Sequence, residues 1–509
     1  MKTNIYKIHN VKYCHLLFMA LFMAVSCSDD YLELEPQTNL NEKSFFKTPT
    51  QIEQAVNGAY VPLRNLTNLE YWVFAEMRSD NTTFQFYQAD RGLENRGLVD
   101  YFLTDASHDL SMGGLWNGSY DGIARCNAVL ENIDKIEGLT ASKKNQFIGE
   151  VKFLRAFYYY NLVLQFGGVP LELSTTQDPG EANSDGRASK DAIYESVIAD
   201  LMDAENLLPK TYGDIDRGRA TSGAAKTLLA KVYMIQKKYT EALTVLKGIT
   251  GYSLVTGSDE SYKDVFNPNN KGNTEIIFAV QYLGSEEGQG SNFMYQFAPN
   301  NSGNIVTGDP QMLNLNSGSG WNTPTQDMIR AYEEGDLRKD ISMQEGFVDN
   351  DGNFVNQPYV SKYNFGFDLS GSTSVNFPTF RYADVLLMMA ECLNEQAYVA
   401  NGEAFDLVNQ IRERAGLEDL TVVDAGNQEA FRNAVFHERR IELAFENHRW
   451  YDLIRSGNAV EVMNAHGEEE QTLRADIIPA GAYNVSENKL LLPIPQRAVT
   501  LDGLEQNPQ

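Results

Sequence analysis

Residues 144–170 read KNQFIGEVKFLRAFYYYNLVLQFGGVP, and this stretch decides the fold class. An aromatic stripe at Phe153, Phe157 and Tyr160 follows the spacing of three and four residues that marks one face of a helix. A glycine pair followed by Pro170 is a typical helix stop. We therefore predict a long apolar helix over residues 144–166.

Helical periodicity recurs on both sides of this stretch and predicts further helices over residues 117–133 and 190–208. Residues 220–250 also match the packing offsets of a tetratricopeptide helix pair, in which small residues let two helices cross closely. A stretched second copy covers residues 381–415, and a third pair covers residues 428–456. The expected fold is therefore mostly α and built on tetratricopeptide-like helix pairs. The offsets of the first pair are carried by Leu229, Ala230, Tyr233, Ala242 and Leu246.

Two long stretches between the helical blocks have a different composition. Residues 67–115 mix aromatic and polar side chains, and residues 252–378 are rich in Gly, Asn, Ser and aromatics. Segments of this length inside a compact protein are usually functional or disordered, and the aromatic content argues against disorder. The segment TEIIFAVQ at 274–281 has a strand pattern and predicts small hairpins in the second stretch. Both stretches are therefore expected to be functional insertions.

The N-terminus has the parts of a secretory signal peptide. Three lysines within the first twelve residues give a basic start, and LLFMALFMAV at 16–25 is too short to span a bilayer, which needs roughly 20 residues. Cys27 stands at the expected cleavage point, as in bacterial lipoproteins, where that cysteine becomes the new N-terminus. We predict a signal peptide over residues 1–26 and lipidation of Cys27 by acyl chains such as palmitate. Cleavage nearby with free secretion is the alternative.

The remainder of the chain is predicted to form a tether and one domain. Residues 27–45 are acidic and polar and would join the lipid to the body. Length alone allows about three domains. We predict a single domain over residues 46–509, with an N-terminal half near 46–250 and a C-terminal part near 251–509.

Composition excludes some partners. The chain has 509 residues, 42% of them hydrophobic, a mean hydropathy of −0.37 and a formal net charge of −27. Loss of the three signal-peptide lysines gives −27 − 3 = −30. Such a surface repels nucleic acids and anionic headgroups, so no nucleic-acid partner is expected. Cys126 and Cys392 lie in apolar helical patterns far apart, which favours two buried free thiols over a disulfide.

Catalytic motifs are missing from the chain. It has no Gly-x-Ser-x-Gly, no phosphate-binding loop and no Cys-x-x-Cys pair. His437-Glu438 lacks a second histidine one turn later, where Ile441 stands, so a zinc-protease site is rejected. The charged residues from Glu438 to Arg455 are instead expected to form ion pairs that lock helices together. A carboxylate pair for glycoside hydrolysis stays open, because 69 acidic residues make many pairs; we nevertheless expect no enzymatic activity, no cofactor and no metal.

One segment resembles the start of a calcium loop. Residues 349–353 read DNDGN, but the acid that closes such a loop at the twelfth position is replaced by Val360. We predict a hairpin turn here. Weak Ca²⁺ binding near Asp349 and Asp351 is the alternative.

Sugar binding needs a different set of side chains. Flat aromatics match the C–H face of a pyranose, and Asn, Asp and Arg satisfy its hydroxyl rim. Both insertions supply this mixture, and we expect them to meet on one face with an exposed Trp321 as the main stacking residue. For each aromatic, core packing is the alternative, and it is the expected role of the other three tryptophans. The stacking candidates are Trp321, Tyr295, Phe84 and Tyr87, and the rim candidates are Asp80, Asn81 and Arg91.

Several motifs follow one another along the chain. They are LWNGSY at 115–120, EVKFLRAFYYYNLVLQFGGVP at 150–170, RYADVLLMMAE at 381–391, VNQIRERAG at 408–416, HERRIELAFENHRWYDLIR at 437–455, LLPIP at 491–495 and the closing QNP at 506–508. In this order they resemble the SusD/RagB family of outer-membrane nutrient-binding lipoproteins, and the resemblance covers essentially the whole mature chain. One departure is Asn447, which stands where the family often has glycine.

The resemblance implies a helical fold whose irregular insertions form the ligand surface. It also implies a lipoprotein on the outer face of the outer membrane that captures oligosaccharides for a SusC-like TonB-dependent transporter and acts as a lid over its mouth. Ligand residues vary between family members, so the resemblance itself assigns none. Capture of peptides, which occurs in part of the family, is one alternative, and glycoside hydrolysis is another.

Overall fold

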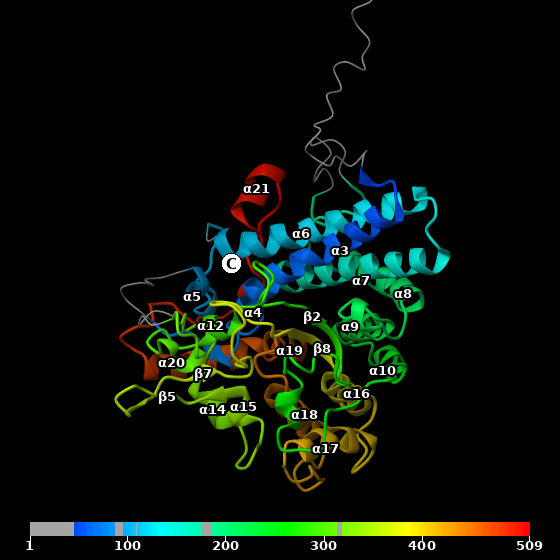
Figure 1. The fold of residues 1–509 in the computed structure, drawn as a ribbon. Coiled ribbons are helices and arrows are strands. Elements are labelled where there is room, and N and C mark those ends of the chain that lie inside the picture. Colours follow the sequence, from blue (N-terminus) through cyan, green and yellow to red (C-terminus); the bar gives the residue numbers. More distant parts are fainter. Residues whose placement is uncertain (1–44, 87–94, 108, 176–185, 313–317) are drawn as a thin grey trace, which may run out of the picture.

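The structure is a computed structural model that describes residues 45–86, 95–107, 109–175, 186–312 and 318–509. The predicted signal peptide, Cys27 and the tether up to residue 44 lie outside the described residues. Helices predominate, so the expected mostly α fold is confirmed (Figure 1). The longer helices are α3 (Pro49–Asn68), α6 (Asp109–Asn132), α7 (Ala141–Phe166), α8 (Lys190–Leu207), α9 (Ser222–Ile235), α10 (Tyr239–Lys247), α16 (Tyr382–Gln396), α17 (Glu403–Arg414), α18 (Gln428–Glu442) and α20 (Ala459–Leu473).

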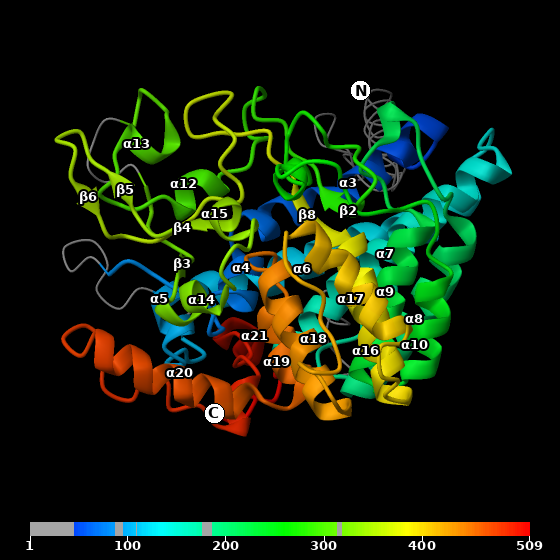
Figure 2. The ribbon, with the colours of Figure 1, turned by 90° about the horizontal axis from the view of Figure 1, so that it is seen from below.

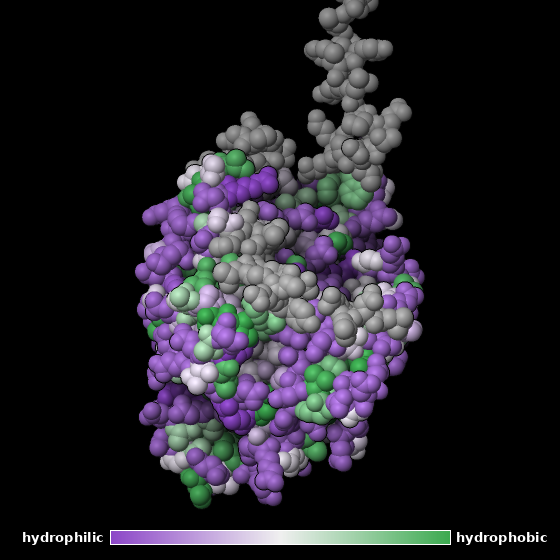
Figure 3. All heavy atoms as spheres, turned by 90° about the vertical axis from the view of Figure 1, so that its left-hand side faces the viewer, coloured by the Kyte–Doolittle hydropathy of each residue, from purple (hydrophilic) through white to green (hydrophobic). Residues whose placement is uncertain are grey.

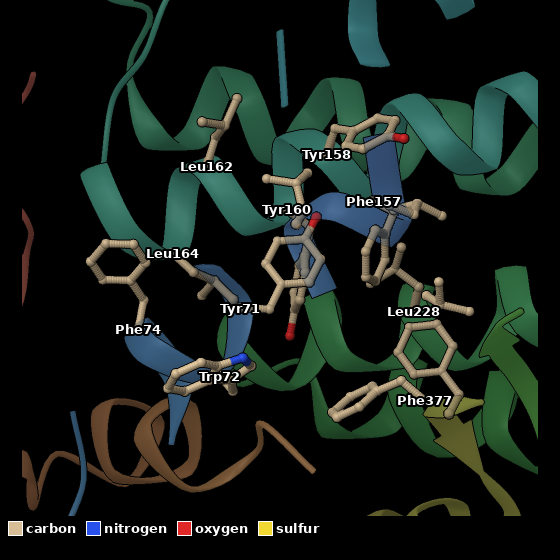
Figure 4. Packing of buried hydrophobic residues seen from close by; sticks show 14 of the residues in the cluster. Tyr71, Trp72, Phe74, Phe157, Tyr158, Tyr160, Leu162, Leu164, Leu228 and Phe377 are labelled. Carbon is tan, nitrogen blue, oxygen red and sulfur yellow. The ribbon is translucent and has the colours of Figure 1, made fainter. Parts of the chain in front are cut away.

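The predicted central helix is α7, which begins three residues before the predicted start. The side chain of Thr140 caps it by accepting the backbone N–H of Lys143 at 3.3 Å. Gly167 ends it with a φ of 72°, which favours glycine. Every residue from Phe153 to Phe166 is buried, as the aromatic packing around Phe157 illustrates (Figure 4). Each large apolar side chain buried in this way contributes about 1.5–3 kcal/mol, so α7 anchors the core.

The long helices pack side by side in an ordered array. α3 packs against α6, α6 against α7 and α7 against α8, and the array continues through α9, α10 and α16 to α17 and α18. Figure 2 shows α7, α9, α16 and α17 along one side of the molecule. The pairs α9–α10 and α16–α17 confirm the tetratricopeptide-like predictions for residues 220–250 and 381–415. Residues 428–456 also form two helices, α18 and α19 (Arg449–Ser456).

Two long helices, α3 and α20, go beyond the sequence predictions. At the start of α3, Thr48 and Gln51 form a capping box, and Pro49 occupies the first turn, where its missing N–H is harmless. Pro62 lies inside the same helix, where proline usually costs about 3 kcal/mol or more. Contacts of α3 with α6 and α7 offset this cost.

Four two-stranded antiparallel sheets complete the described part of the chain. The predicted strand at 274–281 is confirmed as β2, but its partner β8 lies about a hundred residues later instead of in a local hairpin. The pair β5–β6 is a true hairpin. The strand pairs are β1 (Thr82–Thr83) with β3 (Thr323–Pro324), β2 (Ile276–Val280) with β8 (Phe377–Arg381), β4 (Met343–Gln344) with β7 (Tyr359–Val360), and β5 (Phe347–Val348) with β6 (Phe354–Val355).

The two insertions are more regular than their composition suggested. Short helices interrupt both, and α6 already begins at Asp109 inside the first. The shorter helices are α4 (Glu70–Ala75), α5 (Asn95–Asp100), α11 (Ser261–Asp264), α12 (Phe293–Phe297), α13 (Asn304–Thr307), α14 (Gln326–Ala331), α15 (Lys339–Ser342) and α21 (Gln496–Asp502), with 3-10 turns η2 (Ile133–Lys135), η3 (Asp214–Asp216) and η4 (Glu487–Leu490).

The ion pairs predicted for α18 and α19 are confirmed, but most join different elements instead of running along one helix. The buried guanidinium of Arg381 contacts Glu275 at 2.7 Å and also pairs with Glu442. Glu442 meets Arg338 at 3.0 Å and pairs with Arg414. Burial raises the pKa of Glu442, but the three arginines outweigh it and hold that pKa well below its usual range. The cluster joins the end of β8 to α17 and α18, and removing one partner from such a cluster costs about 3–5 kcal/mol.

The predictions for the cysteines and the remaining tryptophans are confirmed. Cys126 and Cys392 are free and buried. Trp72, Trp116 and Trp450 all lie in the core. Across the described ranges, no helix has the length and apolar character needed to cross a bilayer.

Candidate ligand-binding site

The strand pair β1–β3 brings the two insertions together, as predicted. Beyond the antiparallel pair, the backbone N–H of Gln85 donates to the carbonyl oxygen of Gly320 at 2.7 Å. We call residues 80–86 and 318–325 the platform. All five described candidates gather here: Asp80, Asn81, Phe84 and Trp321 belong to the platform, and the carbonyl oxygen of Tyr295 accepts the N–H of Ser319 at 2.9 Å.

Close backbone approach explains the glycines of the platform. A Cβ on Gly318 would lie 2.3 Å from the carbonyl oxygen of Pro299, and a Cβ on Gly320 would lie 2.7 Å from Oε1 of Gln85. Gly320 also has a φ of 60°. The glycines, which suggested an exposed loop in the sequence, are therefore required here by tight packing.

The expectation of an exposed Trp321 is wrong. Its side chain is 3% exposed and packs against the ring of Phe84, with 5.4 Å between ring centroids. The guanidinium of Arg96 lies 5.1 Å from the indole centroid. The backbone also holds this segment inward, since the backbone N–H of Trp321 donates to the carbonyl oxygen of Gln296 on α12 at 2.9 Å. No face of the indole is therefore open to a pyranose.

Phe84 and Tyr295 are also packing residues, contrary to their expected stacking role. Phe84 is 2% exposed and lies 5.3 Å from Tyr101, centroid to centroid. Tyr295 is 5% exposed, and its hydroxyl donates to Oδ2 of Asp309 at 2.9 Å. Burial raises the pKa of Tyr295 above its usual value. The predicted cluster exists, but it forms the floor of the surface and not its exposed side.

Asp80 and Asn81 do not form a hydroxyl-binding rim, because arginines of α18 and α19 use their polar atoms. Arg449 donates two hydrogen bonds to the Asp80 carboxylate, at 2.7 and 2.8 Å. Arg440 donates to Oδ1 of Asn81 at 2.8 Å. Burial raises the pKa of Asp80, but Arg449 and Arg440 outweigh it and hold that pKa well below its usual range.

Glu76 joins the first insertion to the C-terminal helices. Its carboxylate accepts the backbone N–H groups of Phe445 at 2.9 Å and Asn447 at 3.0 Å, together with Nδ2 of Asn81 at 2.9 Å. Burial raises the pKa of Glu76 to about 7. Asn447 has a φ of 66°, which explains why the resembling family often has glycine here.

The other two candidates, Tyr87 and Arg91, lie outside the described residues and stay predictions. In the first insertion the described residues stop at Phe86, and in the second they resume at Gly318 after residues 313–317. Gln85 and Asn301 are half-buried at this border, and Nε2 of Gln85 donates to Oδ1 of Asn301 at 3.3 Å.

Solvent-exposed aromatics lie elsewhere, and sequence reasoning missed them. All four tryptophans belong to the described part of the chain, and none is more than 6% exposed. Phe354 on β6 is 62% exposed and Phe367 is 38% exposed. Phe354 pairs across the hairpin with Val348, which is 56% exposed, so the hairpin presents an apolar pair to solvent. Figure 3 shows one face of the molecule, where hydrophobic patches are interleaved with hydrophilic ones.

The turn of this hairpin contains the segment that resembled a calcium loop. The predicted hairpin is confirmed. Oδ1 of Asp349 accepts the backbone N–H groups of Asp351 at 2.9 Å and Asn353 at 2.8 Å. The hydrogen bonds from Asn353 lower the pKa of Asp349. Within the described ranges, no cluster of three or more His, Cys, Asp or Glu side chains is arranged to hold a metal ion, and weak Ca²⁺ binding at this turn stays a prediction.

Asp100 is a buried acid directly behind the platform. Its Oδ2 accepts hydrogen bonds from the hydroxyls of Thr83 at 2.9 Å and Tyr483 at 3.1 Å. Burial raises the pKa of Asp100 to about 7. A pKa near neutrality can mark a catalytic acid, but the Asp100 side chain is 0% exposed, so a glycosidic oxygen cannot reach it. We assign Asp100 to the structure of the platform.

Comparisons with known proteins give one consistent result. Residues 343–509 match the profile described as the SusD family, and residues 30–234 match the profile described as starch-binding associating with outer membrane. A SusD-like protein of Formosa agariphila is 30% identical, with 96% of this chain and 95% of the relative covered.

Solved structures agree with the sequence relatives. A laminarin binding SusD-like protein has a TM-score of 0.73 at 25% identity and covers 91% of this chain and 99% of its own. Surface glycan-binding protein A from Bacteroides thetaiotaomicron, solved in complex with laminarihexaose, has a TM-score of 0.73 at 22% identity and covers 91% of this chain and all of its own (100%). At that identity the second similarity supports the fold alone.

Proposed function

The chain belongs to the SusD family, and on that premise we propose that it is a cell-surface lipoprotein that binds glycans. It captures oligosaccharides outside the cell and delivers them to a SusC-like TonB-dependent transporter. The observation that carries this proposal is the similarity, over nearly the whole chain, to a SusD-like protein that binds laminarin. The ligand class is therefore a neutral or nearly neutral oligosaccharide, in keeping with the net charge of −27.

The residues that contact the ligand in this proposal differ from those predicted from the sequence. The buried platform supplies a rigid floor, and the exposed side chains around it make contact. Phe354 offers an aromatic face to a sugar ring, and the half-buried amides of Gln85 and Asn301 offer donors and acceptors to hydroxyls. Tyr87 and Arg91 keep their proposed stacking and rim roles.

Anchoring and delivery are part of the same proposal. Acylated Cys27 would hold the protein on the outer membrane, facing the cell exterior. The profile description that mentions association with the outer membrane supports this location. In this proposal a SusC-like partner receives the ligand from the exposed side of the platform.

The protein is a binding protein and not an enzyme. The raised pKa of Asp100 belongs to a fully enclosed side chain, and Glu76 is held by three N–H donors. Neither side chain is free to act as one of the two carboxylates that flank the scissile bond in glycoside hydrolysis.

Affinity electrophoresis separates these possibilities. The chain from residue 27 onward, carrying Cys27→Ser, is run through gels that contain laminarin, starch or no polysaccharide, and titrated in parallel with a mixed peptide library. Retardation by one polysaccharide, without release of reducing ends, supports the proposal. Binding to peptides alone would favour peptide capture, and sustained release of reducing sugar would favour a hydrolase.

A further inference from the structure

A groove of about 490 Å³ lies between α3, the segment 215–219 and β2. Its volume is in the range of ligand sites. None of its lining residues belongs to the platform, so it is separate from the proposed glycan surface.

The groove exposes apolar side chains on three sides. Val61 of α3 is 38% exposed, Leu283 is 45% exposed and Ile215 is 99% exposed. An isoleucine that is almost fully solvated gains from any partner that covers it. The three side chains come from segments far apart in sequence and converge on one space.

The groove is also locally basic in an acidic protein. Its lining holds Arg64, Arg217 and Arg219 against one carboxylate, that of Asp216. Arg219 is engaged, with Glu150 at 3.0 Å and Asp216 at 2.8 Å. Arg64, in contrast, donates to the neutral Oε1 of Gln289 at 3.3 Å and has no carboxylate within ion-pair distance among the described residues. Arg217 pairs only with the solvent-exposed Asp214 among those residues. Arg64 is therefore available to an acidic partner, and Arg217 is held only by an exposed ion pair, which contributes little.

The third wall of the groove is formed by β2. Residues 278–280 line the groove but are only 3–5% exposed, and the carbonyl oxygen of Ala279 already accepts Nε2 of Gln281 at 2.9 Å. β2 therefore closes the groove, and the exposed side chains around it are the ones open to a partner.

The sequence of this chain contains a segment with matching chemistry. Residues 29–35 read DDYLELE, with Leu32 and Leu34 alternating with Glu33 and Glu35. In an extended conformation the two leucines point to one side and the two glutamates to the other.

The segment is also within reach of the groove. From Glu35 to Phe45, where the described chain begins, ten residues span up to about 33 Å. Along α3, the distance from Pro49 to Arg64 is about 22 Å at ~1.5 Å per residue.

We propose that residues 29–35 dock into this groove in an extended conformation. The leucines cover Val61, Ile215 and Leu283. The glutamates face Arg64 and Arg217. Docking takes up part of the tether and so holds the body closer to Cys27 than a free tether would. The inference does not depend on which ligand the platform surface binds.

Disulfide trapping tests the contact directly. The chain from residue 27 onward carries Cys27→Ser, Leu34→Cys and Ile215→Cys; the native Cys126 and Cys392 are buried and stay silent. The control replaces Ile215→Cys by Val423→Cys, which is 90% exposed between α17 and α18, at the opposite end of the molecule from α3 (Figure 1). Under mild oxidation we expect the groove pair to form an intramolecular disulfide about tenfold faster than the control pair.

Charge reversal tests the specificity of the contact. Arg64→Glu with Arg217→Glu should slow trapping about fivefold, and adding Glu33→Lys with Glu35→Lys should restore it, whereas Arg497→Glu on the exposed α21 should change nothing. Equal trapping rates for the groove and control pairs would overturn the proposal. So would a disulfide that forms only between two molecules and slows on dilution, since that result indicates a second copy as the occupant.

Discussion

Arg449 donates two hydrogen bonds, of 2.7 and 2.8 Å, to the carboxylate of Asp80, which lies 369 residues earlier in the sequence. Side-chain exposures of 11% and 4% leave this pair nearly dry. The pair joins α19 to the start of β1 and thereby fixes the floor of the proposed ligand surface. A carboxylate that the sequence suggested for sugar hydroxyls is thus a structural anchor.

Removing the arginine of this pair should destabilise the protein strongly. Arg449→Met leaves Asp80 buried without its bidentate partner, and we expect the free energy of unfolding to fall by about 3–5 kcal/mol. Urea unfolding followed by circular dichroism measures the loss. Arg497→Met, at an exposed position, is the matched control and should change stability by less than about 0.5 kcal/mol. Equal behaviour of the two variants would contradict the structural role.

Trp321→Ala should act on stability and not on ligand contact. The buried indole packs on Phe84, so truncation should cost about 3–5 kcal/mol. Trp321→Phe, which keeps an aromatic ring in the same space, should cost less. Thermal unfolding ranks the variants, and glycan affinity is measured on the folded fraction at low temperature. If the Trp321→Ala protein folds normally but loses its affinity for glycans, the indole contacts the ligand and the packing role is wrong.

Phe354→Ala should show the opposite behaviour. The exposed ring contributes little to the core, so stability should change by less than about 0.5 kcal/mol. If it stacks on a sugar, affinity should fall by about 1–3 kcal/mol, on the scale of aromatic stacking against nucleic-acid bases. Isothermal titration with the polysaccharide that binds best measures both variants. Val348→Ala, the cross-strand neighbour, serves as control and should leave affinity nearly unchanged.

Asp100 should make stability fall as the pH rises. Its pKa is about 7 in the folded protein against a usual 3.8, so the folded state holds the proton more tightly than the unfolded state. The contribution of Asp100 to the free energy of unfolding is fully present below about pH 4 and is lost progressively up to about pH 7. The change from 3.8 to about 7 corresponds to roughly 4 kcal/mol at ~1.4 kcal/mol per pH unit.

Asp100→Asn isolates this contribution. The difference in unfolding free energy between the wild type and the variant should favour the wild type more at pH 5 than at pH 8. Chemical unfolding at several pH values supplies the measurement. A difference that stays constant from pH 5 to pH 8 would show that Asp100 titrates normally.

Cys27→Ala should separate anchoring from folding. Without the cysteine, acylation cannot occur, and the protein should leave the membrane fraction while its unfolding midpoint stays the same. Fractionation and protease accessibility of intact cells measure the first effect. Unchanged membrane association of the variant would contradict lipidation.

The helices that could be predicted are those whose signals are local. α7 carries its own stripe, cap and stop within residues 140–170, and the α9–α10 pair repeats a known spacing. α3 escaped prediction because Pro62 interrupts its pattern, and only packing against α6 and α7 makes the proline tolerable. Periodicity reports the apolar face of one segment and contains no information about the contacts that neighbouring segments provide.

The location of the platform could be predicted from the sequence, but the burial of its side chains could not. Composition located both insertions and their meeting, because aromatic, Gly and Asn residues concentrate there. Burial depended on partners far away in sequence: Arg449 for Asp80, and Gln85 for the close approach of Gly320. The residues exposed instead, such as Phe354, lie in a hairpin where the sequence pattern predicted only the turn.

The carboxylate of Glu76 has a consequence for how the protein is made. Its partners Phe445 and Asn447 lie 369 and 371 residues downstream. The first insertion therefore cannot reach its final state while the chain is still emerging from the ribosome, since synthesis delivers these partners last. If the predicted signal peptide directs export, this delay keeps the Glu76 contacts open until the C-terminal residues have also crossed the membrane.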